Sequence, residues 1–227
     1  MCLKLSADKL LMKMKAIIFL IFLILTQIIL PQQSNLSKAV NNISDYIASD
    51  HFNQIRINYG DLIATDSIFT YAIKLTNYDY GDALLALMLA TVPYREVPIQ
   101  IPLIKIMVNY PLVSADEKTF LKKNENLPAH LFLDSPSDKF GDKDKLAHYF
   151  GSAFLSYESN IFDLGKLIGY FVEAFEESFK VQSSIDMRDI DVNYYGRLFG
   201  NLLKENKDLL PSQIFLLRSV RYLRVIL

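Results

Sequence analysis

The chain has little of what several common kinds of site require. It contains no tryptophan, 3 histidines and one cysteine, Cys2. A single cysteine near the N-terminus excludes a disulfide framework, a cysteine-based zinc site and a thiol nucleophile in the body of the protein. The formal net charge is -1, so no basic excess predicts nucleic-acid binding. The sequence also lacks a phosphate-binding loop, a dinucleotide fingerprint and a serine–histidine–acid signature.

The longest uncharged run lies near the N-terminus. Lys13 and Lys15 precede residues 16–30, which carry no charge and end before Pro31. A basic lead followed by a short apolar run is typical of an export signal. The run is shorter than the ~20 residues of a comfortable membrane span, although tilt would let it serve as an anchor. We expect residues 1–34 to be a signal peptide or membrane anchor, and the protein to be exported, either periplasmic or membrane-associated.

The region 35–113 gives mixed signals for secondary structure. Residues 35–48 have apolar side chains at helical intervals, and residues 83–92 are rich in helix formers. Residues 55–75 alternate partly as a strand does, but they are also compatible with a helix. Prolines interrupt residues 93–111, which indicates extended structure. We therefore expect a small mixed α/β region here.

The pattern changes in the second half of the chain. Residues 114–143 form a polar connector rich in Asp, Lys, Ser and Pro, and we place a domain boundary within it. Beyond it, residues 144–227 are expected to form a C-terminal bundle of about four helices. The candidate helices are 144–157, 164–180, 189–203 and 212–227. The predicted fold class is α+β, mainly α.

Two of these candidate helices carry the same pattern. Each begins with an acid and continues along one helical line with a polar side chain and glycine: Asp144, His148 and Gly151 in the first, Asp189, Asn193, Gly196 and Gly200 in the second. Positions i, i+4, i+7 and i+11 project from nearly one line of a helix. Glycine costs a helix interior about 1 kcal/mol relative to alanine, so these glycines need a packing or functional reason.

A third polar stripe lies on residues 164–180, where Gly169 and Glu173 are opposite an apolar face. For this helix alone, a solvated face and an interior polar seam are equally supported. If the three stripes face one another, their polar groups converge. The predicted polar cluster is Asp144, Lys145, His148, Glu173, Asp189 and Asn193, and the predicted helix-packing glycines are Gly151, Gly169, Gly196 and Gly200.

A buried cluster of acids needs compensation for its charge. A proton shared among the carboxylates, a cation such as Lys145 or Arg188, or a bound metal ion would supply it. A histidine with several acids is a reasonable ligand set for zinc or manganese; here that set is His148, Asp144, Glu173 and Asp189. A structural hydrogen-bond network is the alternative, because a lone histidine near acids is more often structural.

Two further features are weaker. The acidic loop 134–144 does not fit the spacing of an EF-hand, so we expect it to be a solvated loop. The C-terminal arginines Arg218, Arg221 and Arg224 could meet anionic lipid head groups. Ordinary packing is the expectation for this tail, because its apolar residues do not gather on one clean face.

The order of the motif residues resembles the shared core of VanZ-like proteins and YfiM-type lipoproteins. The matching residues lie within 142–203: Asp144, Lys145 and His148, then Glu173, then Asp189, Asn193, Gly196 and Gly200. The resemblance implies a helical protein of the cell envelope. VanZ-like members span the membrane several times, whereas this chain has no run of about 18 apolar residues beyond residue 30. The lipid-attachment cysteine of the YfiM arrangement is also missing.

Three functional hypotheses follow. In the first, the polar cluster has a structural or binding role in a cell-envelope protein whose partners are membrane or envelope components. In the second, His148 and the carboxylates hold zinc or manganese in a metal-dependent envelope hydrolase. In the third, residues 50–113 form an interaction surface. The sequence leaves open whether the protein is an enzyme.

Overall fold

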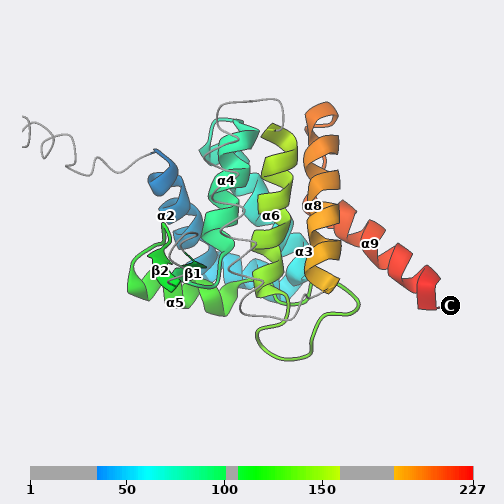
Figure 1. Ribbon diagram of the computed structural model, residues 1–227, viewed down its shortest axis with the longest axis horizontal. Helices are drawn as coiled ribbons and strands as arrows, with labels where there is room; N and C mark the ends of the chain where they lie inside the picture. The colour runs from blue at the N-terminus through cyan, green and yellow to red at the C-terminus, as the bar shows by residue number, and fades with distance from the viewer. Residues whose placement is uncertain (1–34, 101–106, 159–186, 227) are drawn as a thin grey trace, which may run out of the picture. The chain divides into compact units, whose positions relative to one another are not determined.

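The computed structural model describes residues 35–100, 107–158 and 187–226. This part of the chain contains seven helices and a two-stranded hairpin. The apolar stretches of helices from both halves pack together. Figure 1 shows α4 (Tyr80–Thr91), α6 (Lys143–Glu158) and α8 (Met187–Glu205) in a row. Within this row α4 contacts α6, and α6 makes its most extensive contact with α8.

The first two described helices follow one another almost without a break. Helix α2 (Asn35–Ala48) buries one face, and helix α3 (Asp50–Leu75) begins where the Ser49 side chain accepts a hydrogen bond from the Phe52 backbone amide at 3.1 Å. A side-chain oxygen at this position satisfies an amide that has no partner within the helix. Within α3 the backbone leaves helical geometry at Gly60, where φ is 84°. Glycine adopts such angles readily, so α3 kinks there.

Helix α4 is the central element, because most of its side chains are buried. Asn77 and Tyr78 reverse the chain after α3 with positive φ angles. Asp79 then caps α4 by accepting a hydrogen bond from the Asp82 amide at 3.0 Å. After α4, strands β1 (Glu96–Gln100) and β2 (Met107–Pro111) pair antiparallel.

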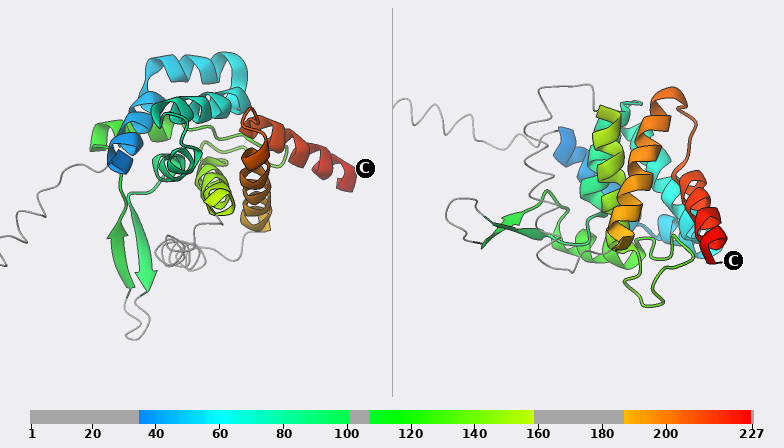
Figure 2. Two further views of the ribbon diagram at one scale, coloured as in Figure 1. Left: turned by 90° about the horizontal axis from the view of Figure 1, so that it is seen from above. Right: turned by 45° about the vertical axis from the view of Figure 1, so that its right-hand side comes forward.

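Helix α5 (Glu117–Asn126) lies inside the stretch that the sequence suggested as a polar connector. Asp116 starts it by accepting hydrogen bonds from the amides of Lys118 and Thr119. Helix α9 (Pro211–Ile226) starts at a proline, whose missing amide hydrogen is not needed in the first turn. The left view of Figure 2 shows α9 running away from α8 toward the C-terminus.

One hydrophobic core joins helices from both halves of the described chain. It includes Val40 of α2, Ile68 of α3, Leu87 of α4, Phe150 of α6 and Phe199 of α8, each of them 0% exposed. The Tyr149 ring lies at the centre and contacts Phe199 and Phe215 at centroid distances of 5.4 and 4.6 Å. Burial of these large apolar groups is the main source of stability for the helix arrangement.

The predicted fold class, α+β, is wrong. The described part of the chain is helical, and the β1–β2 hairpin is too small to form the sheet layer of a mixed fold. The misleading segment is 55–75, which belongs to α3. Its apparent alternation comes from Ile57 and Tyr59, which are 63% and 69% exposed and therefore mark no buried face of a strand.

The expected helices at 35–48, 83–92, 144–157, 189–203 and 212–227 are confirmed, with ends that differ by a few residues. The candidate helix 164–180 lies outside the described residues. Within the ranges that the structure describes, each helix is either too short or not apolar enough to cross a bilayer.

Candidate functional site: the polar cluster between helices α6 and α8

Helices α6 and α8 approach closely because glycines stand at their contact. A Cβ atom on Gly196 would lie 2.4 Å from the carbonyl oxygen of Tyr149, and one on Gly200 would lie 2.2 Å from that of Ala153. Neither position has room for a side chain, and this close packing explains why glycine occurs in the interior of the helix at both positions. Gly151 packs against a different helix, because a Cβ atom at this position would lie 2.9 Å from the sulfur of Met88 on α4.

The polar residues of the two stripes meet at one end of this contact. Lys145 of α6 pairs with Asp144 at 3.1 Å and forms a short ion pair with Asp189 of α8. The side chain of Lys145 is 6% exposed, and those of the two aspartates are 16% and 18% exposed. An ammonium group shielded to this degree is stable as a cation only beside carboxylates. The lysine thus links the two helices through charge.

His148 lies one helical turn beyond Asp144 and faces the same pair of acids. Its Nε2 is 4.0 Å from Oδ1 of Asp189, which is an electrostatic contact and too long for a hydrogen bond. Burial lowers the pKa of His148, while the charges of Asp189 and Asp144 act in the opposite direction and that of Lys145 lowers it further. The net direction is downward, so the imidazole is neutral at pH 7.

Two residues that the sequence did not single out complete the cluster. Ser152 donates a hydrogen bond from Oγ to Oδ1 of Asn193 at 2.9 Å, which joins α6 to α8 one turn further along. Burial raises the pKa of Tyr94, and the negative charge of Asp144 raises it further, so this ring lies within electrostatic range of that acid. Tyr94 follows α4 in a segment with no motif, and its proximity to Asp144 depends on the tertiary fold.

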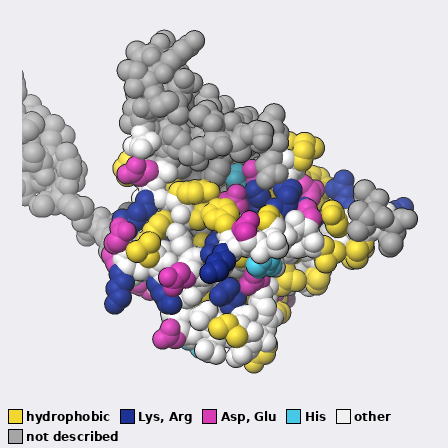
Figure 3. Space-filling view, turned by 90° about the horizontal axis from the view of Figure 1, so that it is seen from below, with side chains coloured by type: hydrophobic (Ala, Val, Ile, Leu, Met, Phe, Trp, Pro, Cys, Tyr) yellow, Lys and Arg dark blue, Asp and Glu magenta, His cyan; other side chains and the backbone are white. Residues whose placement is uncertain are grey.

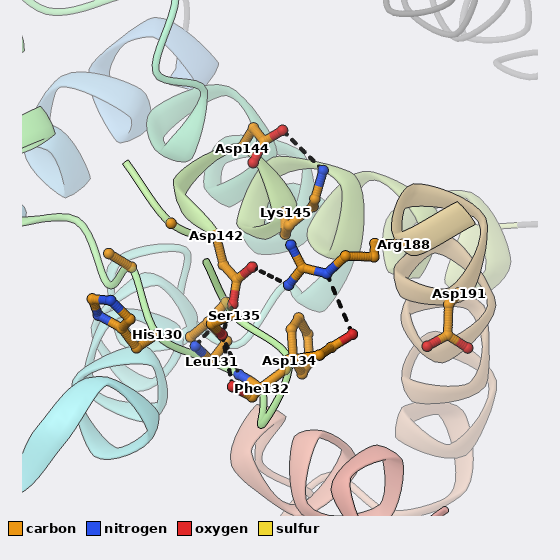
Figure 4. Close-up of polar contacts among 12 residues, drawn as sticks. His130, Leu131, Phe132, Asp134, Ser135, Asp142, Asp144, Lys145, Arg188 and Asp191 are labelled. Atoms are coloured by element: carbon orange, nitrogen blue, oxygen red, sulfur yellow. Dashed lines mark hydrogen bonds and ion pairs between the residues drawn. The ribbon is translucent and has the colours of Figure 1, made fainter. Parts of the chain in front are cut away.

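A second ionic network lies beside the first and was not predicted. Arg188 of α8 points toward the loop before α6, where it pairs with Asp142 and with Asp134 (Figure 4). Arg218 of α9 binds the same Asp134 through two hydrogen bonds of 2.7 and 2.9 Å. Arg218 also donates to Asp191 at 2.6 Å. The network therefore holds a loop and two helices together.

Asp142 is the most deeply placed acid of this second network, with a side chain that is 0% exposed. Besides Arg188, it accepts hydrogen bonds from the Leu131 amide at 3.1 Å and from the Ser135 hydroxyl. The expectation of a solvated acidic loop at 134–144 is therefore wrong for Asp142. The loop folds back because its carboxylates find arginines from distant parts of the chain.

Arg188 and Arg218 do not have the environments that the sequence suggested. Arg188 was a candidate cation for the polar cluster, but it neutralises Asp142 and Asp134 instead. Arg218 was grouped with Arg221 and Arg224 in a basic tail, yet it is 3% exposed and its guanidinium lies 4.1 Å from the centre of the Phe132 ring.

The cluster offers limited means to hold a metal ion. In the described ranges, no three side chains of histidine, cysteine, aspartate or glutamate converge as metal ligands do. The ammonium of Lys145 lies between Asp144 and Asp189, where a cation shared by these carboxylates would lie. Glu173, a predicted member of the cluster, and Gly169, a predicted helix-packing glycine, fall outside the described residues.

The structure thus brings together five of the predicted polar residues: Asp144, Lys145, His148, Asp189 and Asn193. The likeness to VanZ-like and YfiM-type proteins rests on the motif residues between 142 and 203, and what it implies about the role of the protein is a proposal. No protein-family model, curated protein or solved structure matches this chain.

Proposed function

We propose that the protein is a helical component of the cell envelope in which the α6–α8 polar cluster has a structural role, fixing how these helices pack. The observation that carries the proposal is the placement of the Lys145 ammonium between Asp144 of its own helix and Asp189 of α8. A buried cation with a carboxylate from each helix penalises sliding or separation of the pair, because either movement leaves charges without partners.

The charges of the cluster support this role over that of a metal centre. With His148 neutral, two carboxylates face one ammonium, so Lys145 already offsets one of the two negative charges. A divalent ion would have to displace Lys145 from between the acids and then repel it at short range. The glycines point the same way, since Gly196 and Gly200 place the backbones in contact and leave little space between the helices for a substrate.

Two features of the sequence support location in the cell envelope. A basic lead and the apolar run 16–30 have the layout of an export signal or anchor, and the motif residues resemble those of envelope proteins. Cell fractionation of the full-length chain tests this part. Recovery from the periplasm or the membrane fraction is expected, and recovery from the cytosol alone would contradict it.

The metal-dependent hydrolase is the competing hypothesis, and metal analysis separates the two. The full-length protein would be treated with a chelator, exposed to zinc or manganese, and passed through a desalting column before its metal content and helicity are measured. A folded protein with substoichiometric metal is expected. Near-stoichiometric metal that falls in a His148→Gln variant, but not in a His51→Gln control, would overturn the structural role.

A further inference from the structure

Helix α9 carries exposed apolar side chains on the side opposite its core contacts. Ile214, Phe215 and Arg218 face the protein and are 3%, 0% and 3% exposed. Leu216, Val220 and Leu223 are 54%, 65% and 43% exposed. Their spacing of four and three residues places these three side chains on one line of the helix. Apolar residues on α9 therefore form two faces, one buried and one exposed. This is why the sequence pattern did not indicate a single apolar face.

The charged residues of α9 are all basic. The helix contains Arg218, Arg221 and Arg224 and has no acidic residue. Asp134 and Asp191 neutralise Arg218. Arg224 lies in an exposed position beside the outward apolar line. Arg221 is also exposed but lies on the side of α9 toward α8, where it donates to the Tyr195 hydroxyl at 3.5 Å. An apolar stripe with exposed arginines along one side is complementary to a surface with an apolar interior and a negative boundary.

The apolar surface continues from α9 onto α8. The Arg221 guanidinium lies 6.0 Å from the centre of the Tyr194 ring, so these residues are neighbours. Tyr194, Ile190 and Met187 are spaced along one side of α8 and are 49%, 50% and 71% exposed. Hydrophobic and basic side chains lie next to one another toward the right-hand edge of Figure 3.

We propose that the outward stripe of α9, Leu216, Val220 and Leu223 with Arg221 and Arg224, lies on an anionic lipid surface. The apolar side chains would enter the boundary between head groups and acyl chains, and the arginines would contact phosphates. Figure 1 shows the C-terminal half of α9 projecting past α8, and the three apolar side chains of the stripe are each at least 43% exposed. This contact goes beyond the structural role of the α6–α8 cluster and does not depend on it.

The absence of tryptophan makes a direct test simple. Leu223→Trp in the full-length chain gives a fluorophore at the stripe alone, and Tyr59→Trp, on an exposed part of α3, gives a matched control. Each variant would be mixed with vesicles of phosphatidylcholine with or without phosphatidylglycerol, some of them containing brominated lipid. Circular dichroism would verify that both variants keep their helical content.

The expected result is a blue shift and quenching of the Leu223→Trp fluorescence with phosphatidylglycerol vesicles and no change for the Tyr59→Trp control. Quenching of the fluorophore in the stripe should fall severalfold when Arg221→Gln and Arg224→Gln are added. Three outcomes would overturn the proposal. The first is an unchanged Leu223→Trp spectrum, and the second is an equal response with and without anionic lipid. The third is a blue shift that grows with protein concentration in the absence of vesicles, which would mean that the stripe binds a second copy of the chain.

Discussion

Gly200 of α8 lies against Ala153 of α6 so closely that a Cβ atom on the glycine would stand 2.2 Å from the alanine carbonyl oxygen. No side-chain movement relieves such a contact, because the obstructing atom belongs to the backbone of a helix. The two helices must therefore separate if residue 200 acquires a side chain. The polar cluster near the other end of the contact would be strained by the same movement.

Gly200→Ala should destabilise the protein by about 2 kcal/mol, since overpacking outweighs the higher helix propensity of alanine. Urea denaturation followed by circular dichroism measures the change. Asn201→Ala is the matched control, because Asn201 is on the same helix and exposed, and it should alter the free energy of unfolding by less than about 0.5 kcal/mol. Equal effects of the two substitutions would show that the helices do not touch at Gly200.

Asp142→Asn should be strongly destabilising. It removes the negative charge that the buried carboxylate presents to Arg188 and weakens the acceptor for the Leu131 amide and Ser135. Loss of one partner of a buried ion pair costs about 3 kcal/mol. The same substitution of an exposed acid, Glu125→Gln, breaks only the surface pair with Lys122 and should cost less than about 1 kcal/mol. A mild effect at position 142 would contradict the network.

The stability of the protein should rise with pH because of Lys123. Its side chain is buried against Phe120 and donates to the Val92 carbonyl at 2.7 Å, and burial lowers its pKa from 10.5 to about 7. Between these values the unfolded chain binds a proton that the folded chain does not, so stability is lost as the pH falls from 10.5 toward 7 and is constant below.

Lys123→Met removes this dependence. The difference in free energy of unfolding between the native protein and Lys123→Met should shift by about 2 kcal/mol between pH 7 and pH 9, in favour of the native protein at the higher pH. Denaturation at both values measures it, with Lys122→Met as an exposed control that shows no such shift. A pH-independent difference at position 123 would mean that this lysine keeps an ordinary pKa.

His148 should resist protonation. Burial lowers its pKa below the ordinary 6.5, so the unfolded chain takes up a proton first as the pH falls. Stability is therefore lost below pH 6.5 until the folded-state pKa is passed. Proton NMR of the imidazole, assigned with a His148→Gln variant, measures the pKa directly. A value at or above 6.5 would show that Asp189 and Asp144 dominate over burial.

The sequence predicted the α6–α8 contact because its signal is local. Acid, polar residue and glycine recur along single helices, and helical spacing alone places them on one line. The pairing of Lys145 with Asp189 then follows from the cost of burying charge. The partners of Arg188 and Arg218 carry no such signal, since Asp134 and Asp142 lie in a loop far from both in the chain.

The prediction of an α+β fold was wrong because it also depended on local sequence patterns. The backbone of α3 kinks at Gly60, and the apolar residues Ile57 and Tyr59 are exposed. The spacing of apolar residues in this segment therefore does not show which side chains are buried, although the prediction assumed that it does. Helix α5 was missed because it is mostly polar, although Asp116 provides a cap. Tyr94 could not be assigned to the cluster, because its segment reaches Asp144 only through the packing of α4 against α6.

A double-mutant cycle on Lys145 and Asp189 tests the structural role of the cluster most directly. The free energies of unfolding of the native protein, Lys145→Met, Asp189→Asn and the double variant give the coupling between the two side chains. A favourable coupling of about 2 kcal/mol is expected, with each single substitution costing about as much as both together. Additive effects, with a coupling near zero, would mean that this ion pair does not hold α6 to α8.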